Sequence, residues 1–322
     1  MDKGIPTNIP CQLLALIKKQ TTQDVQPGVS ALIEAARKLH GESVRAVLFY
    51  GSCLQTGNVH DGLSDLYLLV DDYHSAFKSR TLAFANNLLP PNVFYLEVPF
   101  EGRVLRAKYA VLALNDFHKG TEHWFHSYLW GRFSQKCGIV YVHDEPVAHQ
   151  VHEALANAVM TFVGHTLPQL KTSFTARDLW AKGLSLSYRA ELRTEQPDAA
   201  ARLFDLDPDY YRELTNVALE SMPFTVSVEA DVEPSTYQVQ IPAKTRRLNS
   251  MEWRVRALQG KVLSVLRLLK GLFTFKGGVD YIQWKIERHS GARVEVSPTL
   301  KRFTPLALVV IFWRLYRQGA FR

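Results

Sequence analysis

The chain has 322 residues, of which 47% are hydrophobic and 21% charged, so its composition is that of a globular protein and excludes a largely disordered one. Its three cysteines, Cys11, Cys53 and Cys137, have no CxxC spacing, so neither a disulfide framework nor a zinc site is expected. The formal net charge is +7, and no apolar run reaches the roughly eighteen residues of a conventional membrane span.

The first 145 residues predict a small mixed sheet with helices. Apolar residues at helical spacing predict a helix over 29–40, which ends at Gly41. Apolar runs rich in β-branched and aromatic residues predict strands over 44–50 and 66–70. The remaining predictions here are a hairpin from 93–98 and 104–114, a helix over 121–135 and a strand over 139–142.

The pattern becomes helical from residue 146 onward. The predicted helices cover 145–170, 175–195 and 208–221, and the last two begin at Thr175 and Asp207, which suit helix caps. A polar stretch, 227–243, then separates a helical domain (146–243) from the basic C-terminal region (244–322). The apolar stripe from Val255 to Phe273 has helical spacing, and we expect it to pack in a core.

The last quarter of the chain carries most of the positive charge. From Pro242 to Arg322 there are 17 Lys and Arg against 4 Asp and Glu, whereas the first 241 residues hold 21 against 27. Residues 303–313 are uncharged and flanked by basic residues, but as a helix they span only about 16 Å, too short to cross a bilayer. We therefore expect an interfacial helix on anionic lipid, with nucleic acid as the weaker alternative because no RNA-binding motif is present.

The pattern most suggestive of chemistry is a strand that runs into Gly51-Ser52, followed twelve residues later by Ser64-Asp65 at the start of a second strand. A glycine lets the backbone approach a triphosphate, and a serine donates hydrogen bonds to it. A carboxylate on the next strand is suited to hold Mg²⁺. This arrangement is typical of polymerase-β-type nucleotidyltransferases, although Gly51-Ser52 can also be a plain turn.

The second acidic residue of such sites normally lies two positions after the first, and here that position is Tyr67. A tyrosine does not replace a carboxylate as a Mg²⁺ ligand. Asp71, six residues after Asp65, lies about 20 Å away along a straight strand. The alternatives are therefore an inactive site, a chain that bends to bring in Asp71 or the adjacent Asp72, or a ligand from Glu97 on the next predicted strand.

Later segments make one family stand out. In chain order the matching blocks are Tyr50-Gly51-Ser52, Asp65, Asp71-Asp72, 105–111, 128–136, 183–193, 211–214 and 270–274. In these blocks the chain resembles the mitochondrial-type CTP:phosphatidate cytidylyltransferases, the translocator assembly and maintenance family, including bacterial relatives. The resemblance spans roughly residues 44 to 285 and depends on the shared order of the blocks. It implies an α+β fold: a polymerase-β-type nucleotidyltransferase domain (1–145) with a mixed sheet, a helical domain and a basic amphipathic C-terminal tail.

The resemblance also implies a Mg²⁺-dependent reaction of CTP with phosphatidic acid that gives CDP-diacylglycerol and pyrophosphate. Because a phosphate monoester is already an anion at neutral pH, catalysis would be mainly positioning and charge stabilisation. The implied catalytic residues are Asp65, Lys108 and Arg132. The implied nucleotide-binding residues are Tyr50, Gly51, Ser52, Lys136, Tyr188 and Arg193, and the implied metal ligands are Asp65, Asp71 and Asp72.

Taken with the basic tail, these features predict a peripheral membrane protein that binds an anionic surface. Residues 1–20 lack the pattern of a presequence, so we expect the cytoplasmic face of a bacterial inner membrane, or the matrix side of the mitochondrial inner membrane in a eukaryote. Two other functions remain open. One is an inactive, nucleotide-binding membrane regulator, and the other is a nucleotidyltransferase that acts on a soluble acceptor. Arg132 and Lys136, four residues apart on one helical face, also fit an ordinary solvated surface.

Overall fold

The computed structural model describes residues 8–22, 25–59, 62–191, 198–229, 235–274, 278–279 and 281–283. The chain forms two compact units. The sheet unit comprises residues 24–113, 139–141 and 266–322, and the helical unit comprises 1–23, 114–138 and 142–265. These units cut across the domains proposed from the sequence, because 114–138 belongs to the helical unit and the chain from Leu266 belongs to the sheet unit.

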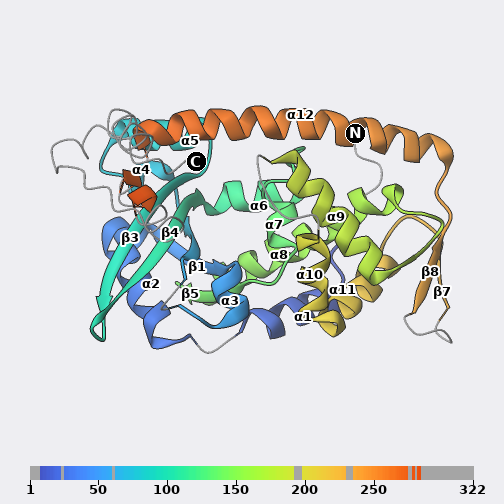
Figure 1. Ribbon diagram of the computed structural model, residues 1–322, viewed down its shortest axis with the longest axis horizontal. Helices are drawn as coiled ribbons and strands as arrows, with labels where there is room; N and C mark the ends of the chain where they lie inside the picture. The colour runs from blue at the N-terminus through green and yellow to red at the C-terminus, as the bar shows by residue number, and fades with distance from the viewer. Residues whose placement is uncertain are drawn as a thin grey trace, which may run out of the picture. The chain divides into compact units, whose positions relative to one another are not determined.

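The sheet unit is built on a five-stranded sheet with the order β3-β4-β2-β1-β5. The mixed sheet expected from the sequence is confirmed, and Figure 1 shows it beside the helices of the chain. Neighbours β1 and β2 are antiparallel, β2 and β4 are parallel, and β3 and β4 are antiparallel. The elements of this unit are α2 (Pro27–His40), η1 (Gly41–Ser43), β1 (Val44–Tyr50), α3 (Ser52–Thr56), β2 (Ser64–Val70), α4 (Tyr73–Ala76), α5 (Arg80–Leu88), β3 (Asn92–Phe100), β4 (Arg103–Ala113) and β5 (Gly138–Val142).

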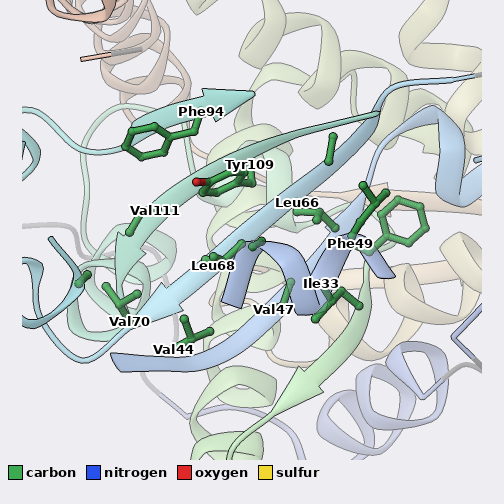
Figure 2. Close-up of a cluster of buried hydrophobic side chains, with 14 of the residues drawn as sticks. Ile33, Val44, Val47, Phe49, Leu66, Leu68, Val70, Phe94, Tyr109 and Val111 are labelled. Atoms are coloured by element: carbon green, nitrogen blue, oxygen red, sulfur yellow. The ribbon is translucent and has the colours of Figure 1, made fainter. Parts of the chain in front are cut away.

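One face of this sheet forms the hydrophobic core of the unit, shown in Figure 2. Alternate residues along a strand point to opposite faces, so the apolar runs of β1 and β2 direct one set of side chains inward. Phe49 pairs with Leu66, Leu66 with Tyr109, and Tyr109 with Phe94, which makes one buried row across four strands. Helix α2 contributes Ile33 to this core. Because side chains alternate along a strand, the residues one position away from the buried row point to the opposite face of the sheet.

The hairpin predicted between residues 93 and 114 is confirmed as β3 and β4. Its turn contains Glu101 with a φ of 48° and Gly102 with a φ of 75°. Both angles lie in the left-handed region, where glycine is free of strain, and this explains the abrupt reversal. The hairpin pairs in register from Asn92 with Val111 to Phe100 with Arg103.

The elements of the helical unit are α1 (Cys11–Thr21), α6 (Leu114–Glu122), α7 (Trp130–Phe133), α8 (Glu145–Thr166), η2 (Leu167–Gln169), β6 (Ser173–Thr175), α9 (Ala176–Ala190), α10 (Ala199–Asp205), α11 (Pro208–Glu220), β7 (Val226–Glu229) and β8 (Thr236–Val239). The unit contains the helices predicted over 145–170, 175–195 and 208–221, together with elements that were not predicted from the sequence, among them α1, α6, α10 and three short strands. The predicted caps are confirmed, since Thr175 accepts from the Asp178 amide and Asp207 from the Tyr210 amide. The helix predicted over 121–135 is wrong, because α6 ends at Glu122 and only the short α7 follows.

The long helix α12 (Ala243–Thr274) contributes its residues up to Val265 to the helical unit and the rest to the sheet unit. The expectation that its apolar stripe packs in a core is wrong. Met251, Val255, Leu258, Val262, Leu269 and Phe273 are each between 51% and 81% exposed. The buried side of the helix instead carries Asn249, Trp253 and Arg256. In the part of the chain that the structure describes, no helix is long and apolar enough to span a bilayer.

Candidate active site

Four side chains form a row across the sheet, on the face opposite the core. Tyr50 pairs with Asp65, Asp65 with Lys108, and Lys108 with Tyr95, so the row crosses β1, β2, β4 and β3. It lies one residue out of step with the buried row that contains Phe49, Leu66 and Tyr109, and strand alternation therefore places it on the other face. The sheet thus brings together Tyr50, Asp65 and Lys108, which the sequence proposed separately.

Asp65 and Lys108 form an ion pair at the centre of this row. The distance from Lys108 Nζ to Asp65 Oδ1 is 2.9 Å, and the side chains are 35% and 21% exposed for Lys108 and Asp65. Burial lowers the pKa of Lys108, but the Asp65 carboxylate together with the nearby tyrosine hydroxyls outweighs this effect, and the net pKa is raised. The ammonium therefore stays charged at physiological pH and is partly open to solvent.

Gly51 keeps space open on the other side of the Asp65 carboxylate. Its φ is 87°, and a Cβ built at this position would lie 3.0 Å from Asp65 Oδ2. Any larger residue would be strained by this φ and would crowd the carboxylate. The short helix α3 begins at the next residue, Ser52, whose side chain is exposed. The Gly51-Ser52 pair therefore ends β1 and also keeps the position next to the Asp65 carboxylate free of a bulky side chain.

Tyr67, at the position where a second acid was sought, is buried on the same face of β2 as Asp65. Its ring lies 5.4 Å from the ring of Tyr50, centroid to centroid. The two tyrosines therefore form an aromatic surface beside Asp65 on the β1 side.

Asp71 and Asp72 lie beyond the opposite end of β2, and the structure does not bring them to Asp65. Asp71 accepts two hydrogen bonds from the Arg45 guanidinium, at 2.5 and 2.7 Å. Asp72 caps α4 by accepting from the amides of His74 and Ser75, and these bonds lower the pKa of its carboxyl, with the Ser75 amide as the largest cause. The physical reason is the rise of a straight strand, about 3.3 Å per residue, over six residues.

Glu97, the other candidate acid, lies on β3, the edge strand beyond β4. It accepts a hydrogen bond of 2.8 Å from the Tyr95 hydroxyl and one of 3.1 Å from Arg106. Two strand spacings therefore separate its backbone from that of Asp65. The sequence did not single out Tyr95, since a tyrosine inside an apolar strand carries no signal of its own.

The proposed phosphate-binding cation Arg132 belongs to the helical unit. It donates a hydrogen bond of 3.1 Å to Glu191, and the two side chains are only 9% and 14% exposed. Its guanidinium also lies over the Tyr128 ring, 4.4 Å from the centroid. Arg132 is therefore held inside the unit by a carboxylate and an aromatic face.

Lys136 is held in a similar way, because its ammonium donates to Asp207 and lies 5.0 Å from the centroid of the Tyr210 ring. Burial raises the pKa of Asp207, but hydrogen bonds from Lys136 and the Tyr210 amide reverse this and leave a lowered pKa. Tyr188 donates a 3.3 Å hydrogen bond to Gln135. Arg193 and the tail over 301–322 lie outside the described residues.

A Mg²⁺ ion fits the donor set at Asp65. Mg²⁺ is commonly bound by one or two carboxylates together with substrate phosphates and water. Asp65 supplies one carboxylate, and Gly51 places no side chain against its Oδ2. Among the described residues no cluster of three or more His, Cys, Asp or Glu is placed to hold a metal, so substrate oxygens would complete the coordination.

Comparison with protein families identifies the chain. The family described as "Phosphatidate cytidylyltransferase, mitochondrial" matches residues 72–264, more than half of the sequence. The chain belongs to this family. As a phosphatidate cytidylyltransferase it is a CTP-dependent nucleotidyltransferase, and the family expected from the sequence is confirmed.

The family match covers Lys108, Arg132, Lys136 and Tyr188 but begins after Asp65. Among solved structures, a nucleotidyltransferase-like protein from Exiguobacterium sibiricum is similar, with 10% identity, 91% of this chain and 92% of that chain covered, and a TM-score of 0.27. That likeness is too distant to bear on function. The comparison with curated proteins gave no match.

Proposed function

We propose that this phosphatidate cytidylyltransferase transfers CMP from CTP to phosphatidic acid at the Asp65–Lys108 pair, for phospholipid synthesis. The observation that carries the proposal is the row Tyr50–Asp65–Lys108, which puts a carboxylate, a cation and the Gly51-Ser52 turn on one solvent-accessible part of the sheet. These are the groups that nucleotidyl transfer requires: a metal ligand, a positive charge for phosphate and a backbone that a triphosphate can approach.

In the proposed reaction an oxygen of the lipid phosphate attacks the α-phosphorus of CTP. The new P–O bond forms as the bond between the α-phosphorus and the bridging oxygen breaks, and pyrophosphate leaves with that electron pair. The attacking group is already an anion, so no residue has to remove a proton. Lys108 stabilises the charge that builds up on the phosphate oxygens, and Ser52 donates a hydrogen bond to the triphosphate.

Asp65 is the proposed ligand for Mg²⁺, through Oδ2, the oxygen next to Gly51. When bound, the metal would neutralise triphosphate charge and help to align the two phosphates. Asp71 and Asp72, which serve Arg45 and α4, are not needed for this arrangement. Arg132 and Lys136 remain candidates for additional phosphate contacts, in which case they would share their charge between substrate and the carboxylates of Glu191 and Asp207.

The exposed stripe of α12 supports a peripheral position on an anionic membrane. Its apolar side chains are accompanied by the exposed cations Lys244, Arg247, Arg254 and Lys261, and Glu252 is the only acidic residue of the helix. Apolar groups flanked by cations suit the interface of an anionic bilayer. We propose the cytoplasmic face of a bacterial inner membrane, or the matrix face of the mitochondrial inner membrane, as the location.

Vesicle cosedimentation tests this surface. Replacing Leu258 by Asp should weaken binding to anionic vesicles by on the order of tenfold or more, because one leucine buried in lipid contributes about 2 kcal/mol. Leu206→Asp is the matched control, since Leu206 is 62% exposed and Leu258 67%. Equal binding by both variants and the wild type would remove α12 from the membrane contact.

Tyr67 favours a second function, an inactive nucleotide-binding regulator at the membrane, because it occupies the position of the second acidic metal ligand. Incubation of the protein with α-labelled CTP, Mg²⁺ and vesicles containing phosphatidic acid separates the possibilities. We expect labelled CDP-diacylglycerol, formed in equal amount to pyrophosphate. CTP binding without any labelled lipid would favour the regulator, and label on a water-soluble acceptor would favour the third possibility, a nucleotidyltransferase of soluble substrates.

A further inference from the structure

A tyrosine from the far end of the chain lies beside the proposed active site. Tyr281 follows α12 and belongs to the sheet unit. Its ring lies 5.6 Å from the ring of Tyr95, centroid to centroid, with the planes inclined by 55°. Val279, two residues earlier, is buried. Tyr281 therefore packs against the edge strand β3 of the sheet.

Tyr95 occupies a defined place in the active-site row. It pairs directly with Lys108 across β3 and β4, so both side chains project from the same face. Its hydroxyl donates to Glu97, which also accepts from Arg106, and these bonds fix the ring. Tyr281 thus packs against a ring that is itself anchored next to Lys108.

We propose that Tyr281 is a positioning residue of the Asp65–Lys108 site. Its ring, packed on Tyr95, covers the Lys108 side chain from the β3 edge and holds the ammonium toward Asp65 and the phosphates of CTP. Asp65 is flanked on its other side by Tyr50 and Tyr67, so the ion pair lies between two aromatic pairs. The inference rests on the proposed function for its catalytic consequence, but the covering of Lys108 is independent of any reaction.

The covering is tested by chemical labelling of the full-length protein. Acetylation of Lys108 is followed by mass spectrometry, with the exposed Lys261 as internal reference. Tyr281→Ala should raise the acetylation rate of Lys108 several-fold relative to Lys261, and Tyr281→Phe should keep the wild-type rate because the ring is retained. The matched control is Tyr141→Ala, since Tyr141 is half-buried like Tyr281 but lies on β5, the opposite edge of the sheet.

Turnover supplies the second readout. Tyr281→Ala should lower kcat/KM for CTP by up to about a hundredfold, because a small displacement of a charge-stabilising group has such an effect. The KM of Tyr281→Ala for phosphatidic acid should stay near the wild-type value. Tyr281→Phe and Tyr141→Ala should keep a wild-type kcat/KM for CTP. An unchanged Lys108 acetylation rate in Tyr281→Ala would overturn the proposal, as would faster acetylation with unchanged turnover. A third outcome separates the two proposals: Tyr281 protects Lys108 from acetylation, but the wild-type protein forms no CDP-diacylglycerol. That outcome would overturn the proposed function and would leave the proposed position of Tyr281 over Lys108 intact.

Discussion

The two units hold their principal ion pairs in contrasting ways. In the sheet unit, Lys108 and Asp65 are 35% and 21% exposed, and Gly51 keeps space beside the carboxylate. In the helical unit, Arg132 and Glu191 are 9% and 14% exposed, and Tyr128 covers the guanidinium. A pair that solvent partly reaches is available to a ligand, whereas a nearly buried pair mainly stabilises the structure around it. The contrast teaches that the presence of a Lys or Arg in the sequence does not tell a ligand-binding cation from one that stabilises the structure.

Breaking the enclosed pair should have the largest effect, and the effect should be on stability. Arg132→Met removes the guanidinium that pairs with the nearly buried Glu191 carboxylate, and breaking such a pair costs about 3–5 kcal/mol. Urea unfolding followed by tryptophan fluorescence measures this loss. Arg132→Met combined with Glu191→Leu should recover much of it, because no lone charge then remains. Full stability of the single variant, together with lost CTP binding, would give Arg132 the same ligand-facing role as Lys108.

Breaking the open pair should affect turnover instead. Lys108→Met removes the cation proposed to stabilise the transition state, so kcat should fall by about 10²–10³-fold. The free energy of unfolding should change by no more than about 1 kcal/mol, since a partly exposed pair contributes little to stability. Steady-state kinetics and urea unfolding of the same preparation provide both numbers. A large loss of stability with unchanged kcat would show that the Lys108–Asp65 pair has a structural role, like the Arg132–Glu191 pair.

A buried histidine sharpens the description of the helical unit. Burial first, and the nearby Arg256 second, lower the pKa of His165 to about 3. The unfolded chain takes up a proton below its ordinary pKa of about 6.5 while the native state does not, so stability falls as pH drops. Between pH 7.5 and 5 the loss from this group should be about 2 kcal/mol. His165→Phe should remove that part of the pH dependence, and an identical pH profile for variant and wild type would show that His165 titrates normally.

Local patterns predicted the elements that build the sheet. The apolar runs over 44–50 and 66–70 became β1 and β2, and the residues around Glu101-Gly102 became a hairpin turn. These features depend on neighbours in sequence, which propensity and turn chemistry describe well. Gly51 and Asp65 were also recognisable, because a tight turn followed by an acid at a strand start is a local signal.

Tertiary structure decided the rest. Lys108 meets Asp65 only because β4 pairs in parallel with β2, a register that no local pattern specifies. The α12 stripe was assigned to a core because periodicity gives the spacing of apolar residues but not the side that is covered. In the structure its covered side holds Asn249 and Arg256, which are polar. Tyr281 gave no signal, since its role depends on packing against a strand nearly two hundred residues earlier.

The central claim, that Asp65 is the working carboxylate and Asp71 is structural, is tested most directly by one paired measurement. CMP transfer from α-labelled CTP to phosphatidic acid vesicles is compared between Asp65→Asn and Asp71→Asn. Because both substitutions remove one carboxylate charge from β2 or its end, nonspecific effects should be similar. The account predicts that Asp65→Asn abolishes transfer while the fold persists, and that Asp71→Asn, which loses only the Arg45 pair, keeps near wild-type transfer. Wild-type transfer by Asp65→Asn, or loss of transfer only in Asp71→Asn, would contradict it.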